Sequence, residues 1–231
     1  MSQVVMITGA AGNLGRGVAQ AFAAQGAKLV LVDLKREALV AAYGEEGPDR
    51  LYAPVNLMEQ AQVDASVETA INKFGRIDVL CNIAGGFRMG AQVHELAEAD
   101  WRFLLEINAG TVLHTTHAVV PRMLAAGGGK IINIGAFAAQ KGAAQMGAYI
   151  TSKSAVIRLT ESMAAELREK NINVNCILPT TIDTPENRKA MPDADPARWV
   201  PVADLAATIV FLASPGAKSI HGAAIPITGL S

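Results

Sequence analysis

Short runs of β-branched and other apolar residues alternate with longer segments of helical periodicity along the whole chain. The runs Val4–Thr8, Lys28–Asp33 and Ile77–Ala84 contain few polar side chains, so a strand formed by each is expected to be buried on both faces. Strands of this kind need helices on both sides, and a helix between successive strands makes them parallel. The alternation therefore predicts an α/β fold with a doubly wound parallel sheet of about seven strands flanked by helices.

The remaining elements follow from the same periodicities, and they describe one Rossmann-like domain over residues 1–231. The expected strands are Val4–Thr8, Lys28–Asp33, Leu51–Val55, Ile77–Ala84, Lys130–Ile134, Asn173–Leu178 and Ala223–Ile227. The expected helices are Leu14–Gln25, Arg36–Tyr43, Glu59–Phe74, Ala97–Ala126 (with breaks near Asn108, Gly110 and Pro121), Tyr149–Lys170 and Val202–Ala213. Ligands of such sheets bind outside the carboxyl ends of the strands, so the loops after the strands hold the informative residues.

Composition excludes several classes of partner. Lys and Arg number 20 against 21 Asp and Glu, a formal net charge of −1, so no nucleic-acid partner is expected. Every apolar stretch is interrupted too early for a membrane span, and the first eight residues are expected to form a strand rather than a signal peptide. Cys81 and Cys176 lie in apolar runs with neither CxxC nor His spacing, which predicts no disulfide, no metal site and a cytoplasmic location.

A glycine-rich loop follows the first expected strand. Gly9, Gly12 and Gly15 are spaced by three, directly between a strand and a helix. Gly9 permits a tight turn, Gly12 lets the backbone approach a pyrophosphate, and Gly15 lets the helix pack close to the sheet. Asn13 and Leu14 open the helix, whose free N–H groups favour an anion. In this strand–turn–helix context the loop predicts a dinucleotide site, although an ordinary βα turn is the alternative.

Asp33 ends the second expected strand, 18 residues beyond Gly15. A carboxylate there accepts hydrogen bonds from the adenosine ribose hydroxyls and repels a 2′-phosphate, which predicts NAD(H) in preference to NADP(H). The following Lys35 and Arg36 weaken that repulsion. The alternative role for Asp33 is the N-cap of the next helix, and the two roles are compatible.

Tyr149 and Lys153 lie four residues apart on an expected helix, so their side chains share one face. A free phenol has a pKa of about 10, and a neighbouring ammonium favours the phenolate and lowers that value. The pair is then expected to act as a general acid/base. The alternative is an exposed Tyr–Lys pair without a chemical role.

These motifs together resemble the short-chain dehydrogenase/reductase family over essentially the whole chain. Asn82-Ile83-Ala84-Gly85 is similar to the family's NNAG segment, and Pro179 to Thr184 is similar to its PGxxxT segment. The resemblance implies Tyr149, Lys153 and Asn108 as catalytic residues, Asn108 holding a water linked to the lysine. Besides the glycine loop and Asp33, it implies cofactor contacts from Asn56, Leu57, Asn82, Ala84, Gly85, Tyr149, Lys153, Pro179, Ile182 and Thr184.

Four positions depart from the family pattern. Asn13 stands where the family's TGxxxGxG motif has a glycine, Asn56 replaces an Asp that contacts adenine, and Thr180 replaces the Gly of PGxxxT. The fourth departure is Ala136, 13 positions before Tyr149, where the family has its catalytic Ser. That hydroxyl would hydrogen-bond the substrate carbonyl oxygen, and losing one such donor costs on the order of a hundredfold in rate.

The segment from Leu178 to Pro201 is locally similar to dihydropteridine reductase, a family member that keeps the Tyr and Lys but lacks the Ser. An electron-poor quinonoid substrate needs less carbonyl polarisation, so a site without the Ser is expected to reduce a pterin-like or quinonoid small molecule with NADH. Residues 185–201 are expected to form a substrate lid. The expected pocket residues are Phe87, Ala136, Phe137, Met146 and Trp199, with Met89 beside them, although core or lid packing explains each equally well.

Two alternatives to this enzyme remain open. One is an ordinary alcohol/ketone dehydrogenase with a weakened oxyanion donor, and the other is a catalytically inactive NAD-binding module. Ala136 favours the second, whereas the intact Asn108, Tyr149 and Lys153 argue against it. Family members associate through the two long helices of the second half, so a homotetramer, or alternatively a homodimer, is expected.

Overall fold

The computed structural model describes residues 2–230, and its strands form one parallel sheet. The strand order is β3-β2-β1-β4-β5-β6-β7, which confirms the expected doubly wound arrangement. The strands are β1 (Val4–Thr8), β2 (Lys28–Asp33), β3 (Arg50–Pro54), β4 (Val79–Asn82), β5 (Gly129–Ile134), β6 (Ile172–Pro179) and β7 (Ala224–Ile227). The order reverses between β1 and β4, which is where such sheets bind their ligands.

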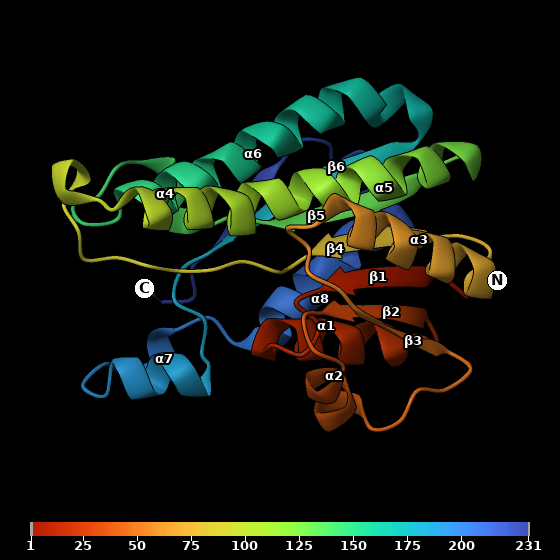
Figure 1. Cartoon of the computed structure of the whole chain (residues 1–231), viewed down its shortest axis with the longest axis horizontal. Helices are drawn as coiled ribbons and strands as arrows, with labels where there is room; N and C mark the ends of the chain where they lie inside the picture. Colours follow the sequence, from red (N-terminus) through yellow and green to blue (C-terminus); the bar gives the residue numbers. More distant parts are fainter. Residues whose placement is uncertain (1, 231) are drawn as a thin grey trace.

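Helices cover both faces of the sheet (Figure 1). The helices are α1 (Asn13–Ala23), α2 (Arg36–Tyr43), α3 (Gln60–Phe74), α4 (Glu98–Leu105), α5 (Thr111–Ala125), α6 (Gly147–Leu167), α7 (Pro185–Ala190) and α8 (Val202–Ala213). In Figure 1, α3, α5 and α6 lie above the sheet and α1, α2 and α8 below it, while α7 projects at one end. Among residues 2–230, no helix is both long and apolar enough to cross a bilayer.

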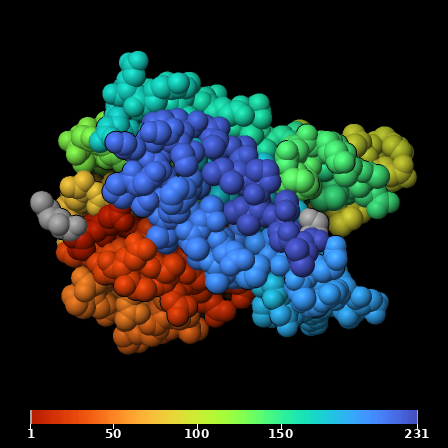
Figure 2. Space-filling view, turned by 180° about the vertical axis from the view of Figure 1, so that it is seen from behind, coloured from red at the N-terminus to blue at the C-terminus, as the bar shows by residue number. Residues whose placement is uncertain are grey.

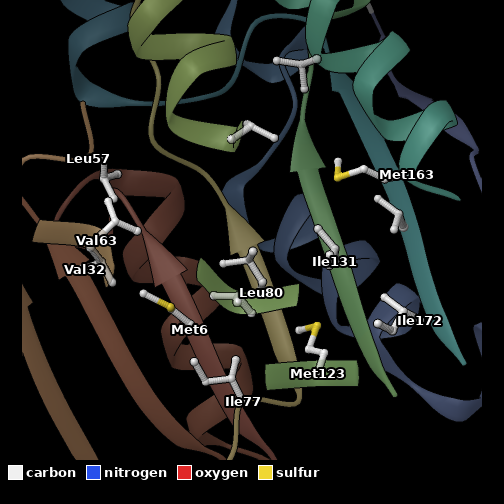
Figure 3. Packing of buried hydrophobic residues seen from close by; sticks show 14 of the residues in the cluster. Met6, Val32, Leu57, Val63, Ile77, Leu80, Met123, Ile131, Met163 and Ile172 are labelled. Carbon is white, nitrogen blue, oxygen red and sulfur yellow. The ribbon is translucent and has the colours of Figure 1, made fainter. Parts of the chain in front are cut away.

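Successive strand residues supply two separate apolar cores. On β1, Val4 and Met6 pack with the helices above the sheet, whereas Val5 and Ile7 pack with α1 and α8 below it. Figure 3 shows the upper core, in which Met6, Leu80 and Ile131 come from three adjacent strands. Burial on both faces explains why these strands lack the alternating polar pattern of half-exposed strands.

Two expected elements differ from the structure around the ligand-binding edge. The strand expected over Ile77–Ala84 is shorter, because the N–H groups of Ile83 and Ala84 donate to the Thr8 hydroxyl at 2.9 and 3.1 Å and leave the ladder. The helix expected over Ala97–Ala126 is interrupted at its expected break near Asn108 and Gly110, where the segment Glu106–Gly110 is π-helical. Pro121, expected to break this helix, lies inside α5 without ending it.

Candidate active site

The loop between β1 and α1 has the shape of a phosphate cradle. Gly9 has φ +63°, and a Cβ at this position would lie 3.0 Å from the backbone of Ala84. A Cβ at Gly15 would lie 2.2 Å from the Gly9 oxygen, so glycine is required at both positions to bring α1 against the sheet. Gly12 differs, because a Cβ there would meet only the Gly9 oxygen at 3.4 Å and Gly12 is exposed. Its missing side chain leaves the N-terminus of α1 open to a ligand such as a pyrophosphate.

Asp33 lies beside this loop at the end of β2. Its Oδ2 accepts a hydrogen bond from the Ala11 N–H at 2.9 Å, and its Oδ1 accepts one from the Leu34 N–H at 2.8 Å. The alternative role as a helix cap is not observed, because the N-cap residue of α2 is Lys35. Asp33 is partly exposed and holds the loop in place, and its contact with a ribose remains a prediction. Arg36, which follows Lys35, is directed to Glu46 at 3.2 Å.

Asn56 and Leu57 lie in the turn before α3. The Asn56 side chain accepts from the Met58 N–H at 3.1 Å, and the Leu57 backbone oxygen contacts His114 Nδ1 at 2.8 Å. These bonds shape the turn at the same edge of the sheet as Asp33. A contact of Asn56 with adenine remains a prediction.

Asn82 belongs to a chain of buried polar side chains that joins β4, β5, α5 and α6. The Thr115 hydroxyl donates to Asn82 Oδ1 at 2.8 Å, and Asn82 donates to Asn133 Oδ1 at 2.9 Å. Asn133 in turn donates to the Thr160 hydroxyl at 2.9 Å. The side chain of Asn82 therefore aligns the central strands, while its neighbours Ala84 and Gly85 line the edge where the cofactor is expected.

Lys153 and Asn108 both lie close to Gly85, in the chain just after the end of β4. A Cβ at Gly85 would lie 2.7 Å from Asn108 Oδ1 and 3.1 Å from Lys153 Nζ. The Lys153 ammonium is buried and donates to the Ile134 oxygen at 2.8 Å. Burial lowers the pKa of Lys153 to about 8. The expected catalytic residues of α6 and the π-helical segment thus converge on one point at the strand ends.

Tyr149 lies one turn before Lys153 on α6. Burial raises the pKa of Tyr149 to about 12. The expected lowering by Lys153 is not seen in this structure, because loss of water around the phenol is the cause of the shift and the Lys153 ammonium is directed to the Ile134 backbone oxygen. At neutral pH the phenol therefore carries its proton, which is the form that a reduction consumes, and its raised pKa makes it a weaker acid than a free tyrosine.

The Asn108 side chain is occupied by protein partners. Its Oδ1 accepts from the Gly86 N–H at 2.9 Å, and its Nδ2 donates to the Gly86 oxygen and to the Ser152 hydroxyl, both at 3.0 Å. The π-helical turn that carries Asn108 widens the helix at this point. Asn108 therefore fixes the chain after β4 and its contact to α6.

Ala136 is buried at the end of β5, in the position where a Ser was expected from the resemblance. Nearby hydroxyls on α6 do not replace it. Ser152 donates to the backbone carbonyl oxygen of Tyr149 at 2.7 Å, and Ser154 donates to that of Ala139 at 2.8 Å. Thr151 is exposed. The site therefore contains the buried phenol without the hydroxyl that usually accompanies it.

Exposed apolar side chains surround the outer end of this site. Phe87 and Phe137 are 57% and 39% exposed, and Met146 borders a small cavity of about 40 Å³. Trp199 differs, because it is only 7% exposed and offers little surface to a ligand. Figure 2 shows a recess at this end, between the green and yellow surface above and the light-blue surface that includes α7 below.

The segment after β6 forms the lower side of the recess. Pro179 ends β6 and pairs with Ile227, and Ile182 pairs with Val200, so this backbone is tied at two points. The Thr184 hydroxyl caps α7 by accepting from the Asn187 N–H at 3.2 Å. The lid expected at residues 185–201 thus contains one short helix, which the pattern of the sequence did not predict.

Two side chains of the site were missed by the sequence analysis. Asn13 Nδ2 donates to Glu186 Oε2 at 2.6 Å, which joins the glycine loop to α7. Ser152 accepts a hydrogen bond from Asn108 and so connects it to α6. Glu186 directly follows Pro185 and is a typical residue for the first turn of a helix. The sequence pattern therefore indicates a helix start there, but it does not predict that Glu186 bonds to Asn13.

Comparisons with known proteins agree with this geometry. The model of the short chain dehydrogenase family matches residues 3–195. D-threitol dehydrogenase of Mycolicibacterium smegmatis is 37% identical over 240 residues, which cover 98% of this chain and 92% of that protein. The structure of NAD⁺-bound xylitol dehydrogenase superimposes with a TM-score of 0.89 at 29% identity and covers 98% of each chain. A 3-ketoacyl-(acyl-carrier-protein) reductase of Brucella melitensis complexed with NADH has a TM-score of 0.88 at 29% identity, covering 98% of this chain and 97% of that one.

Proposed function

This chain belongs to the short-chain dehydrogenase family, and from that premise we propose that it is an NAD(H)-dependent oxidoreductase with Tyr149 as its general acid/base. The observation that carries the proposal is a partly buried phenol one helical turn from a buried lysine, with an open glycine cradle at the same edge of the sheet. This is the edge at which doubly wound sheets bind dinucleotides.

The residues of the cradle fit a dinucleotide. Gly12 and the first turn of α1 would hold the pyrophosphate, Asp33 would hold the adenosine ribose, and Lys153 would hold the nicotinamide ribose. The bound nicotinamide would supply or accept the hydride. Asp33 favours NADH over NADPH, and the bond between Arg36 and Glu46 directs one nearby cation away from a 2′-phosphate.

Tyr149 would donate the proton that accompanies hydride delivery. Its raised pKa keeps the phenol protonated until a substrate atom reaches it, and the surrounding apolar groups exclude competing water. After transfer, solvent would restore the proton. Gly85 leaves room for this arrangement, since a larger residue at position 85 would displace both Asn108 and Lys153.

The missing hydroxyl at Ala136 supports an activated substrate. A plain ketone develops negative charge on oxygen and needs a donor there, whereas an electron-poor pterin-like or quinonoid ring gains stability on reduction. We therefore favour a small conjugated molecule as the substrate. The names of the relatives above favour a second candidate, a dehydrogenase of sugar alcohols or ketones that works with a weakened oxyanion donor.

A substrate panel followed through NADH absorbance separates these possibilities. The panel contains quinonoid dihydrobiopterin, quinones and small ketones with NADH, and polyols with NAD⁺. Faster turnover of the quinonoid compounds supports the activated-substrate proposal, and faster turnover of ketones or polyols supports the second candidate. If NADH binds and no compound reacts, the chain is an inactive NAD-binding module and the proposed function is wrong.

The proposal places the enzyme in the cytoplasm, with neither nucleic acid nor membrane as a partner. Cys81 and Cys176 are free and buried, which is compatible with a reducing compartment. We also propose one catalytic domain over the chain with the 185–201 segment closing on the substrate. Among residues 2–230, no group of three His, Cys, Asp or Glu side chains is placed to hold a metal ion.

A further inference from the structure

Phe87 is a large apolar side chain that remains 57% exposed directly beside the proposed proton donor. Its ring lies 4.8 Å from the Tyr149 ring, centroid to centroid, in an edge-to-face arrangement of 84°. Pairs of this geometry are favourable, so the contact orients both rings. A substrate atom that accepts a proton from Tyr149 must lie within hydrogen-bond distance of the phenol, and its molecule therefore lies close to Phe87.

The backbone on both sides of Phe87 is anchored. The Gly86 N–H and oxygen both bond to the Asn108 side chain. The Arg88 guanidinium pairs with Asp100 and lies 4.0 Å above the Phe103 ring centroid. Two residues further, the Gly90 N–H donates to the Gln145 oxygen at 2.9 Å.

The whole segment from Phe87 to Gly90 is exposed, yet its backbone and the Arg88 side chain are held by these contacts. In an extended segment, side chains of alternate residues point to opposite sides. Positions 86, 88 and 90 are tied to the protein, while Phe87 and Met89 are 57% and 58% exposed between them. A rigid exposed aromatic ring binds a flat partner with little loss of side-chain entropy.

We propose that Phe87 is a specificity-determining residue, a fixed aromatic platform that selects substrates with a planar conjugated ring and holds that ring next to Tyr149. This inference rests on the proposed function and narrows its substrate class. The ring of Phe87 stacks with or packs edge-on against the substrate ring. An acyclic substrate with the same reactive group lacks this contact and gains nothing from Phe87.

The test compares Phe87→Leu with wild type on two activated dicarbonyl compounds, 9,10-phenanthrenequinone and 2,3-butanedione, with NADH as the reductant. Leucine preserves an apolar side chain and removes the flat ring. We expect kcat/KM for the planar quinone to fall about tenfold, mainly through KM, as the loss of an aromatic contact implies. The kcat/KM for butanedione is expected to change by less than about threefold. Phe211→Leu is the matched control, since Phe211 on α8 is 49% exposed, undergoes the same substitution and lies outside the site.

A binding measurement keeps this test independent of turnover. Titration of quinoline, a planar ring without a reducible carbonyl, into the protein with NADH is expected to show equal affinity in wild type and in Phe211→Leu, and about tenfold weaker binding in Phe87→Leu. If quinoline binds in this way and neither dicarbonyl is reduced, the proposed function fails and the platform stands. Equal quinoline affinity in wild type and Phe87→Leu, or equal losses for both dicarbonyls, overturns the platform.

Discussion

At the scale of single residues, burial determines how the two titratable groups of the site behave. Tyr149 and Lys153 both lose water, and each is shifted toward its neutral form. For Tyr149 the neutral form carries the proton that a reduction consumes. For Lys153 the same burial makes the charged form cost free energy, because the ammonium has one backbone acceptor in place of water.

The first prediction concerns the pH dependence of this cost. The pKa of Lys153 is about 8 in the folded protein and 10.5 in the unfolded chain, so the unfolded chain binds more protons between these values. Stability attributable to Lys153 is therefore absent below about pH 8, rises with pH, and is complete above the unfolded value. Relative to Lys153→Met, the wild-type free energy of unfolding should rise by about 3 kcal/mol from pH 7 to 10.5. Urea unfolding of both proteins measures it, and a constant difference contradicts the shift.

The second prediction concerns Asp33. We expect NADH to bind at least about tenfold tighter than NADPH, because the carboxylate repels a 2′-phosphate. Asp33→Asn removes the charge and preserves an acceptor for the Ala11 N–H. It should therefore reduce the difference between the NADH and NADPH affinities without disrupting the loop. Asp33→Ala removes both the charge and the acceptor, so it should also weaken the binding of NADH. Fluorescence titration gives the dissociation constants, and equal values for the two cofactors in wild type refute the prediction.

The glycine spacing and the Tyr–Lys spacing predicted where the site lies, because both depend on local chain geometry. Gly9 adopts a positive φ, Gly15 meets Gly9 and Ala10 within the same turn, and Tyr149 and Lys153 share a helix. The raised pKa of Tyr149 was not predictable, since it depends on how neighbouring segments bury the phenol. The partners of Asn108 were missed for the same reason, because Gly86 and Ser152 lie 22 and 44 residues away.

At the scale of elements, α7 connects the cofactor loop to the lid. The bond from Asn13 to Glu186 crosses 173 residues of sequence, and none of the residues of α7 is buried. A short helix without a buried face depends on its few polar contacts for its position. Asn13, which departs from the family's glycine, thus has a partner that explains an amide at this position.

The third prediction tests this contact. Backbone amides of α7 should exchange readily in the free protein and more slowly with NADH, as expected of a lid. Glu186→Ala removes the acceptor of Asn13 and should speed exchange in α7 without affecting β6. Lys189→Ala on the same helix is the control. Strong protection of α7 in the free wild type, or no response to Glu186→Ala, refutes the prediction.

The order of elements was predictable from hydropathy alone, whereas their ends required tertiary contacts. The apolar runs of β1, β2 and β5 are unambiguous, which explains why the expected bounds of these strands agree with the observed ones. The end of β4 depends on the Thr8 hydroxyl on another strand, and α7 is too short and too polar to show helical periodicity. The π-helical turn at Asn108 similarly follows from packing against the loop after β4.

At the scale of the whole molecule, apolar surface remains on the helices above the sheet. Trp101 on α4 and Leu113 and Leu124 on α5 are 36%, 58% and 40% exposed. Exposed apolar side chains gathered on neighbouring helices are typical of subunit contacts. They support the expectation of a homotetramer, with a homodimer as the alternative.

The fourth prediction is that Leu113→Glu lowers the assembly state, because a charge buried at a subunit contact is unfavourable. Light scattering at micromolar concentration should give a tetramer for wild type and smaller species for the variant. Ala41→Glu, on the exposed surface of α2, should leave the assembly unchanged. A monomeric wild type contradicts both the tetramer and the dimer.

The central claim is that a buried proton donor acts here without the usual hydroxyl because the substrate is already activated. Ala136→Ser tests it most directly, with NADH oxidation measured on a quinonoid substrate and on simple ketones. Tyr149→Phe serves as the reference and should lower quinonoid reduction by about two orders of magnitude. We predict that Ala136→Ser barely changes the quinonoid rate and raises ketone reduction, whose developing alkoxide gains a donor. Strong acceleration of every substrate by Ala136→Ser would contradict the account and identify an impaired ketone dehydrogenase instead.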